Sequence, residues 1–285
     1  MGWFDAIILG IVQGITEFLP ISSSGHLILG EEALGLNVAA LKSFDVALHL
    51  GTLVAILIYF WKDIWGMIKA FGGLFIGRWN LRDEYTGLIG YILIGTVPAV
   101  IVGVLWGDMI DEYFRSPLSV AWMLIGTGVL FFVAEEVNKR VKASGLNSWR
   151  AVAIGLFQAM ALIPGVSRSG STISAGLLGG MSREKAARFS FLLGAPAMFG
   201  AGLWTYLGEV RATANVYVEA GGDPISISYF PFDVLTFVVG FVVSAVVGLV
   251  TVWGLMKFLK KYSLKVFALY LFLIGVVTVL GIEVF

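Results

Sequence analysis

The sequence QGITEFLPISSSGH spans residues 13–26 of this 285-residue chain. An apolar run with a helical pattern, residues 3–19, leads into it, and Pro20 with the Ser/Gly cluster behind it interrupts that helix. A second helical run, residues 149–163, meets a similar interruption, PGVSRSGST, at residues 164–172. A short second helix follows each interruption, so both regions predict helix–loop–helix hairpins.

The composition of the chain predicts an integral membrane protein. Hydrophobic residues make up 58% of it, charged residues only 13%, and the mean hydropathy is +0.91, whereas a soluble domain is about one quarter charged. The net charge of zero provides no global field that would attract nucleic acid. The absence of cysteine excludes disulfides, thiolate zinc sites and cysteine nucleophiles.

Six further segments are apolar and about long enough to cross a hydrocarbon core of about 30 Å. We expect transmembrane helices at 44–61, 88–106, 118–134, 189–207, 234–256 and 266–282. Broken helices are tolerated at membrane depth only where protein buries them or where they line a polar cavity. The two hairpins are therefore expected to be re-entrant, so that each enters and leaves the membrane on one side.

The hairpins belong to an internal repeat with an offset of 145 residues. The matching pairs are Gly10 and Gly155, Gln13 and Gln158, Ser22 and Ser167, Ser24 and Ser169, Gly25 and Gly170, and Phe44 and Phe189, while the proline slips by one position, from Pro20 to Pro164. The reactive positions differ between the copies: Leu162 stands in place of Glu17, Ser171 in place of His26, and Arg168 in place of Ser23.

Each half holds one hairpin and three spans, so the second half must lie upside down relative to the first. The predicted fold is an all-α polytopic membrane protein with an inverted-topology repeat, forming one folded unit. The first repeat, residues 1–140, contains a hairpin at 3–35 and the first three spans. The second repeat, residues 145–285, contains a hairpin at 149–180 and the last three spans.

The basic residues predict the orientation of the chain. With the N-terminus on one side, three of the 19 Lys and Arg residues share that side: Lys42, Arg115 and Arg211. Arg168 lies inside a hairpin loop, and fifteen lie on the other side: Lys62, Lys69, Arg78, Arg82, Lys139, Arg140, Lys142, Arg150, Arg183, Lys185, Arg188, Lys257, Lys260, Lys261 and Lys265. Because cytoplasmic loops are rich in Lys and Arg, both termini are expected on the outer side of a prokaryotic cytoplasmic membrane.

The hairpins contain polar residues that a bilayer does not normally hold. They are Gln13, Glu17, Ser22, Ser23, Ser24, His26, Ser167, Arg168, Ser169, Ser171 and Thr172. An ionisable residue inside a membrane is by default a functional-site hypothesis. Gln13 and Glu17 share a helix face because they are four residues apart, and Glu17 and His26 flank the same break, so both can face the same loop.

This set of residues suits a phosphate group. The planar guanidinium of Arg168 matches phosphate oxygens, and the helices that begin near Gly25 and Gly170 offer free N–H groups and a favourable dipole. Ser and Thr hydroxyls add donors. Glu17 and His26 supply what a binding site does not need, namely an acid or base and a nucleophile.

Structural explanations of the same residues are open at this stage. Glu17 and Arg168 could form a buried ion pair that locks the hairpins together, and His26 could be a hydrogen-bonded core residue. Asp45 and His49 lie one turn apart on the span 44–61, where they could line the cavity or form a hydrogen-bonded pair between helices.

Together, the motif Gln13-x-x-x-Glu17, the string PISSSGH at residues 20–26 and the string PGVSRSGST at residues 164–172 resemble the undecaprenyl-diphosphate phosphatase family of the bacitracin-resistance type. The resemblance covers essentially the whole chain. It implies hydrolysis of undecaprenyl diphosphate to the monophosphate, which recycles the lipid carrier of cell-wall synthesis. It also implies functional roles for Glu17, Ser23, His26, Arg168, Ser167 and Thr172.

The resemblance further implies a divalent cation, Mg or Ca, for which Glu17 would be the ligand because the sequence contains no dedicated metal cage. Gln13, Ser22, Ser24, Gly25, Ser169, Gly170 and Ser171 are expected to help bind the substrate. As partners we expect a polyprenyl diphosphate, membrane lipid and a second copy of the chain in a homodimer, with no nucleic acid.

Two mechanisms and two functions are compatible with these residues. Either Ser23 attacks phosphorus while His26 and Glu17 move protons, which we favour, or His26 attacks and forms a phosphohistidine. An inverted repeat with broken helices is also typical of secondary transporters, so a transporter or flippase of a polyprenyl phosphate or another anion is the alternative function.

Overall fold

The computed structural model describes residues 1–75, 83–219 and 234–284, and within these ranges the chain is helical with no strand. The α-helices and the short 3-10 helix η1 run in the order α1 (Trp3–Thr16), α2 (Ser23–Ala33), η1 (Val38–Leu41), α3 (Lys42–Tyr59), α4 (Trp61–Phe75), α5 (Glu84–Phe114), α6 (Pro117–Asn138), α7 (Ser148–Met160), α8 (Arg168–Leu178), α9 (Arg183–Glu219), α10 (Val234–Leu259) and α11 (Lys265–Val284). The expected helical class is therefore confirmed. Arg78 and Arg82, two of the basic residues used above, lie outside the described ranges.

Five helical segments of the described chain are long and apolar enough to cross a membrane. They are Lys42–Tyr59, Glu84–Ile110, Pro117–Asn138, Arg183–Thr205 and Val234–Leu259, and they coincide with the first five predicted spans. The sixth predicted span, 266–282, falls on α11, which is apolar but belongs with α1 to the shorter apolar helices. The chain is an integral membrane protein.

Both predicted helix breaks are present. The first separates α1 from α2 and contains Ser22, which has a positive φ of 72°, and the second separates α7 from α8 and contains Gly165, with a φ of 92°. Each second helix then begins with the same cap. The Ser22 hydroxyl accepts the N–H of Gly25 at 3.3 Å, and the Ser167 hydroxyl accepts the N–H of Gly170 at 3.1 Å. The repeated Ser and Gly residues thus form matching N-caps.

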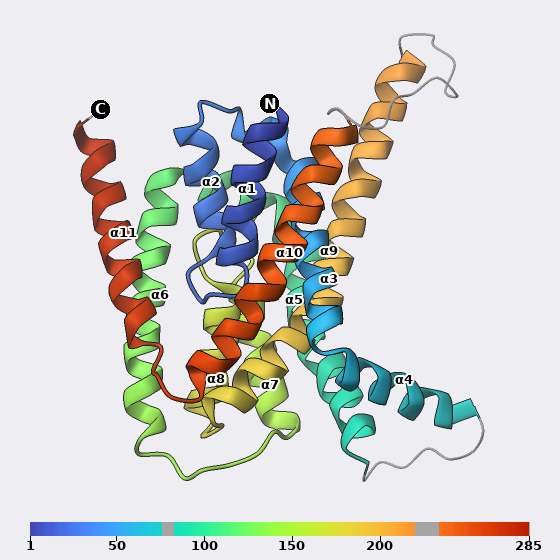
Figure 1. Cartoon of the computed structure of the whole chain (residues 1–285), viewed down its shortest axis with the longest axis vertical. Coiled ribbons are helices and arrows are strands. Elements are labelled where there is room, and N and C mark those ends of the chain that lie inside the picture. The colour runs from blue at the N-terminus through green and yellow to red at the C-terminus, as the bar shows by residue number, and fades with distance from the viewer. Residues whose placement is uncertain (76–82, 220–233, 285) are drawn as a thin grey trace.

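The two broken helices approach each other from opposite ends of the molecule. Figure 1 shows α1 and α2 at the end where both termini lie, and α7 and α8 at the other end. Helix α1 packs against α10, helix α7 packs against α5, and α3 contacts both α9 and α10. Small residues permit these close approaches, as expected between membrane helices; the carbonyl of Gly95 on α5, for example, would lie 2.4 Å from a Cβ at Gly155 on α7.

Aromatic packing fixes the first break against the second half of the chain. Phe18, directly after Glu17, is fully buried and contacts the buried ring of Phe191 on α9, with 5.6 Å between ring centroids. Such edge-to-face pairs contribute about 0.5–1.5 kcal/mol beyond the area they bury. This contact holds the Glu17 backbone next to α9, on which the surroundings of Arg168 are built.

A buried ionic cluster joins α6, α9 and the turn before α11 near the end of the molecule that contains α7 and α8. The carboxylate of Glu135 on α6 is 1% exposed and accepts hydrogen bonds from the Nε of Arg183, at 2.8 Å, and from the backbone N–H of Leu264, at 2.7 Å. Because this buried carboxylate ties α6 to α9 and to the start of α11 and does not line the cavity described below, Glu135 has a structural role.

Candidate active site

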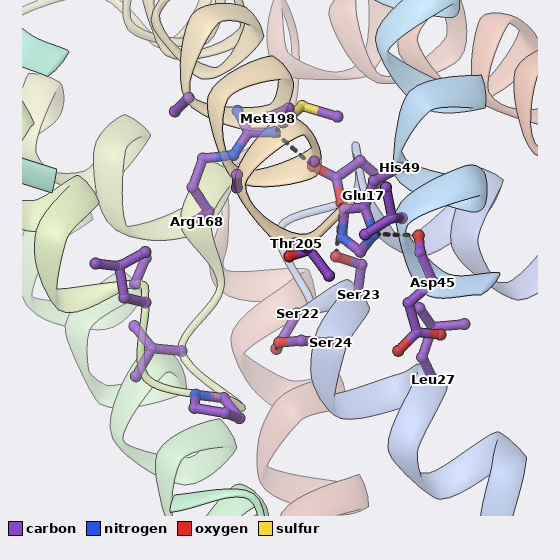
Figure 2. Close-up of a pocket in the computed structure, with 18 of the residues that line it drawn as sticks. Glu17, Ser22, Ser23, Ser24, Leu27, Asp45, His49, Arg168, Met198 and Thr205 are labelled. Carbon is purple, nitrogen blue, oxygen red and sulfur yellow. Dashed lines mark hydrogen bonds and ion pairs between the residues drawn. The ribbon is translucent and has the colours of Figure 1, made fainter. Parts of the chain in front are cut away.

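A cavity of about 350 Å³ lies between the two helix breaks. Its polar wall residues are Glu17, Ser22, Ser23, Ser24, Lys42, Asp45, His49, Arg115, Gln158, Arg168 and Thr205. Figure 2 shows that the labelled residues among them come from both halves of the chain, with Glu17 between Arg168 and His49. The two breaks therefore contribute to one cavity, as expected from the sequence.

The carboxylate of Glu17 lies at the centre of the hydrogen-bond network. It is 6% exposed. Its Oε1 accepts the Nη2 of Arg168 at 2.5 Å, and its Oε2 accepts the hydroxyl of Ser23 at 2.7 Å and the Nε2 of Gln13 at 3.1 Å. The two oxygens are thus divided between a cation on one side and a hydroxyl and an amide on the other.

Ser23 and Arg168 hold equivalent places in the two copies. Ser23 is the first residue of α2 and Arg168 is the first residue of α8. The N-terminus of a helix favours anions through its free N–H groups and its dipole. A hydroxyl and a guanidinium are therefore brought to one carboxylate from two helix N-termini that face a shared cavity.

Several contacts orient the guanidinium of Arg168. Its Nη1 donates to the carbonyl of Ser190 at 3.3 Å, and its Nη2 contacts the Sδ of Met198 at 3.3 Å. The hydroxyl of Thr172 bonds both the carbonyl of Arg168, at 2.8 Å, and the hydroxyl of Ser190, at 2.5 Å. Thr172 therefore supports the backbone of Arg168 and the helix α9 that holds its side chain.

Gly194 on α9 leaves the space that the guanidinium occupies. A Cβ added at Gly194 would lie 1.9 Å from the Nη1 and 2.5 Å from the Cζ of Arg168, which is far closer than nonbonded atoms can approach. Gly194 is the repeat counterpart of His49, because the two differ by the same offset of 145 residues. In one copy this position holds an imidazole next to Glu17. In the other copy it has no side chain, and the guanidinium of Arg168 occupies the space.

His49 is the imidazole that the structure places beside Glu17. Its Nε2 lies 3.7 Å from the Oε2 of Glu17, and its Nδ1 is 2.7 Å from the carbonyl of Asp45. The carboxylate of Asp45 in turn pairs with the Nη2 of Arg115 at 3.3 Å. Of the two alternatives considered for Asp45 and His49, the structure therefore supports a place in the cavity wall.

His26 is not among the residues that line the cavity. Its Nδ1 is 2.8 Å from the carbonyl of Ser22, and its Nε2 is 2.8 Å from the hydroxyl of Tyr270 on α11, whose ring stacks on the imidazole. The structure thus gives His26 partners outside the Glu17–Ser23–Arg168 group. Its catalytic role remains a prediction from the resemblance.

The other predicted binding residues fall into two groups. Ser22 and Ser24 line the cavity, whereas Gln13, Gly25, Ser167, Ser169, Gly170, Ser171 and Thr172 do not. Those of the second group are buried. Gln13 lies near the end of α1 and donates to Glu17, whereas the others lie around the starts of α2 and α8. In this structure the residues around the starts of α2 and α8 cap, fill or support the helix N-termini that carry Ser23 and Arg168.

Sequence reasoning did not include Lys42, Arg115, Gln158 and Thr205 among the site residues, although all four line the cavity. Gln158 carried a detectable signal, because it is the repeat counterpart of Gln13. Lys42, Arg115 and Thr205 lie outside both hairpins, so only the packing of α3, α5 and α9 brings their part of the chain to the cavity.

The donor set around Glu17 does not by itself fit a divalent cation. Both oxygens of Glu17 already accept hydrogen bonds, and a guanidinium lies 2.5 Å from one of them. Within the described ranges, no group of three or more His, Cys, Asp or Glu residues has an arrangement that could hold a metal ion. The divalent cation therefore remains a prediction from the resemblance, and no chemical step is derived through it.

Comparison with known proteins gives a consistent result. The family model for the bacitracin resistance protein BacA matches residues 6–277 of the chain. An undecaprenyl-diphosphatase of Rubrobacter xylanophilus is 47% identical over 94% of each chain. Proteins of the same name from Desulforudis audaxviator and Methanosphaera stadtmanae are 40% and 39% identical, each over at least 96% of both chains.

Proposed function

Because the chain belongs to the bacitracin resistance protein BacA family, we propose that the cavity between its two helix breaks is the active site of its phosphatase reaction. The protein hydrolyses undecaprenyl diphosphate to the monophosphate and inorganic phosphate. This reaction recycles the lipid carrier of cell-wall synthesis and confers bacitracin resistance. The substrate diphosphate is a dianion or trianion near neutral pH, so it requires cationic and hydrogen-bonding partners.

The observation that carries this assignment is the contact of Glu17 with both Ser23 and Arg168. Ser23 donates its proton toward a carboxylate at 2.7 Å, which is the geometry of a nucleophile next to a general base. Arg168, 2.5 Å from the same carboxylate, is in reach of an anion in the cavity. A site that only bound phosphate would need the guanidinium but not the hydroxyl–carboxylate pair.

The residues support a two-step reaction. Glu17 takes the proton from the Ser23 hydroxyl as the Ser23 oxygen bonds to the terminal phosphorus. The bond from that phosphorus to the bridging oxygen breaks, and the lipid monophosphate leaves. Water then attacks the phosphoserine, and as the Ser23 oxygen departs it recovers its proton from Glu17. Arg168 stabilises the charge on the phosphoryl oxygens in both steps.

Arg168→Ala is expected to reduce phosphate release by about 3–4 kcal/mol of transition-state stabilisation, or roughly 10²–10³-fold, by analogy with the loss of an oxyanion donor. Arg168→Lys should retain part of this activity, because it keeps the charge but loses the planar fork. Turnover of a C15 diphosphate in detergent measures both effects. The control is Arg140→Ala, because Arg140 is an exposed residue in the turn after α6 and does not line the cavity. A drop of less than tenfold in Arg168→Ala would contradict this role.

Gly194→Ala should displace the same guanidinium without removing it. Misplacing a catalytic group by about 1 Å can cost about 10²-fold, so we expect phosphate release to fall by roughly 10- to 100-fold. Gly200→Ala is a matched control on α9, because a Cβ at Gly200 meets no described atom within 4 Å. Alanine is the better helix former at both positions, so equal activities of the two variants would contradict the positioning argument.

Phosphate release also separates hydrolysis from transport. The purified protein in detergent should release inorganic phosphate from a C15 diphosphate, and this release should depend on Glu17. A transporter or flippase would bind the same lipid without releasing phosphate. The contact of Glu17 with Ser23 favours the enzyme, because a carrier has no need of an acid–base pair.

We also propose that the two halves form an inverted-topology repeat with re-entrant hairpins. The packing supports it, because α1 contacts α10 of the other half while its repeat counterpart α7 contacts α5.

Both termini lie at one end of the molecule (Figure 1), and the basic residues favour the opposite end as cytoplasmic. The cavity would then open toward the outer face, with lateral access for the isoprenoid tail, and a homodimer remains a prediction.

A further inference from the structure

Gln158 is a buried amide in the wall of the proposed active site. It lies on α7 and is 2% exposed. Neither its Nε2 nor its Oε1 has a hydrogen-bond partner in the part of the chain that the structure describes, and both atoms are shielded from water. Leaving a buried donor and acceptor unpaired costs free energy, because neither is compensated for the loss of hydration.

The repeat explains why the Nε2 of this amide has no acceptor, whereas the Oε1 lacks a partner in both copies of the glutamine within the described chain. Its counterpart Gln13 donates from Nε2 to Glu17, at 3.1 Å, and to the hydroxyl of Thr52, at 3.5 Å. At the offset of 145 residues, Leu162 stands in place of Glu17 and Ala197 in place of Thr52. The second copy has therefore replaced both acceptors of the amide by apolar side chains.

The cavity occupies the place of those lost acceptors. Leu162 and Ala197 both line it, as does Gln158 itself. Ala161, Val166 and Ala201 of the second half also line the cavity. The first half contributes Ser23, His49 and Asp45 together with the apolar residues Leu27, Ile28 and Val46. In the proposed reaction the terminal phosphate must lie at Ser23. The lipid-linked phosphate needs hydrogen-bond donors of its own, and the unpaired amide of Gln158 is a donor in the wall of the same cavity.

We propose that Gln158 is a substrate-binding residue whose amide N–H groups donate to the lipid-linked phosphate of the diphosphate. Gln158 lines the cavity but its amide atoms are shielded from water, so a rotamer change of the side chain would expose the amide to the ligand. The neutral amide of Gln158 would bind the phosphate that leaves with the lipid. The cation Arg168 would bind the phosphoryl group that is transferred. This inference rests on the proposed phosphatase function and extends it to the leaving group.

Product inhibition tests the inference directly. Gln158→Leu should weaken inhibition by a C15 monophosphate by about tenfold or more, since a hydrogen bond to a charged group contributes that much affinity. Inhibition by inorganic phosphate should change by less than twofold. Gln158→Glu, which has the same shape but a negative charge, should weaken binding of the monophosphate further than Gln158→Leu.

Matched variants keep the outcome decisive. Leu156→Ala changes a residue on α7 that is 54% exposed. This variant should turn over the diphosphate, and be inhibited by the monophosphate, as the unmodified protein is. The midpoint temperature of thermal unfolding should not fall in Gln158→Leu, because an apolar residue replaces an unpaired amide. If Gln158→Leu does not fold, Gln158→Met is measured in its place. Unchanged inhibition by the monophosphate in a folded variant, or equal weakening for both products, overturns the inference. Absence of phosphate release by the unmodified protein instead overturns the proposed function.

Discussion

Ser23→Ala is expected to reduce phosphate release from a C15 diphosphate by at least about 10³-fold, the largest effect of any substitution in the cavity. The variant lacks the oxygen that bonds to phosphorus, and removal of a catalytic nucleophile commonly leaves only the activity supplied by binding and charge stabilisation. The Ser23 hydroxyl is the one that donates to Glu17, at 2.7 Å. The turnover number in detergent measures the effect.

His26→Gln is the informative companion to this variant. His26 contacts Tyr270 rather than the cavity, so we expect its replacement to reduce turnover by less than Ser23→Ala does. Rapid acid quenching of a reaction with substrate labelled in the terminal phosphate adds a chemical test, because phosphoserine survives acid and phosphohistidine does not. Acid-labile label on the protein, together with near-normal turnover of Ser23→Ala, would establish His26 as the nucleophile instead.

Glu17→Gln should lower phosphate release by about 10³-fold, within the 10²–10⁴-fold range that a positioned general base contributes. The glutamine has the same shape and can still accept a hydrogen bond from Ser23, but it cannot take the Ser23 proton. It also leaves Arg168 without its anionic partner. The matched control is Glu136→Gln on α6, because this carboxylate is exposed and pairs only with surface lysines in the described structure, which contributes little to stability.

Combining Glu17→Gln with Arg168→Gln separates a catalytic role of Glu17 from a purely structural ion pair. If the contact of Glu17 with Arg168 only locked the hairpins together, breaking it would destabilise the fold by about 3–5 kcal/mol, because one buried charge would be left unpaired. The double variant Glu17→Gln with Arg168→Gln would then recover both stability and activity. We expect stability to be partly recovered and phosphate release to stay lost. Restored release in the double variant would refute a catalytic role for Glu17.

Much of the fold followed from local chemistry. Pro20 and Pro164, each with a Ser/Gly cluster behind it, indicated where two helices break, and the structure has breaks at both places. The composition indicated membrane helices, and five of the six predicted spans coincide with long apolar helices. The contact of Glu17 with Ser23 and Arg168 agrees with the expectation that both breaks face a shared site. The catalytic roles of these residues stay predictions until they are measured.

Side-chain directions were the part that sequence reasoning could not provide. His26 lies three residues after Ser23 on α2, which is close enough in sequence for both to face the loop. The packing of α11 instead gives its imidazole a partner in Tyr270. His49, 32 residues after Glu17 in the sequence, becomes the nearest imidazole, because its position depends on how α3 is rotated against α1 and α10.

The sequence by itself determined the membrane class, the two helix breaks, the repeat and the residue types at each break. The membrane class and the helix breaks depend on neighbours within a few positions, where backbone propensity, capping and hydropathy act. The repeat is visible directly as matching residues 145 positions apart. Only the tertiary structure decided that Gly194 makes room for Arg168, that His49 rather than His26 lines the cavity, and that Gln158 lacks a partner. Each of these depends on contacts between helices far apart in the chain, and their rotation and spacing are set by packing that no local pattern encodes.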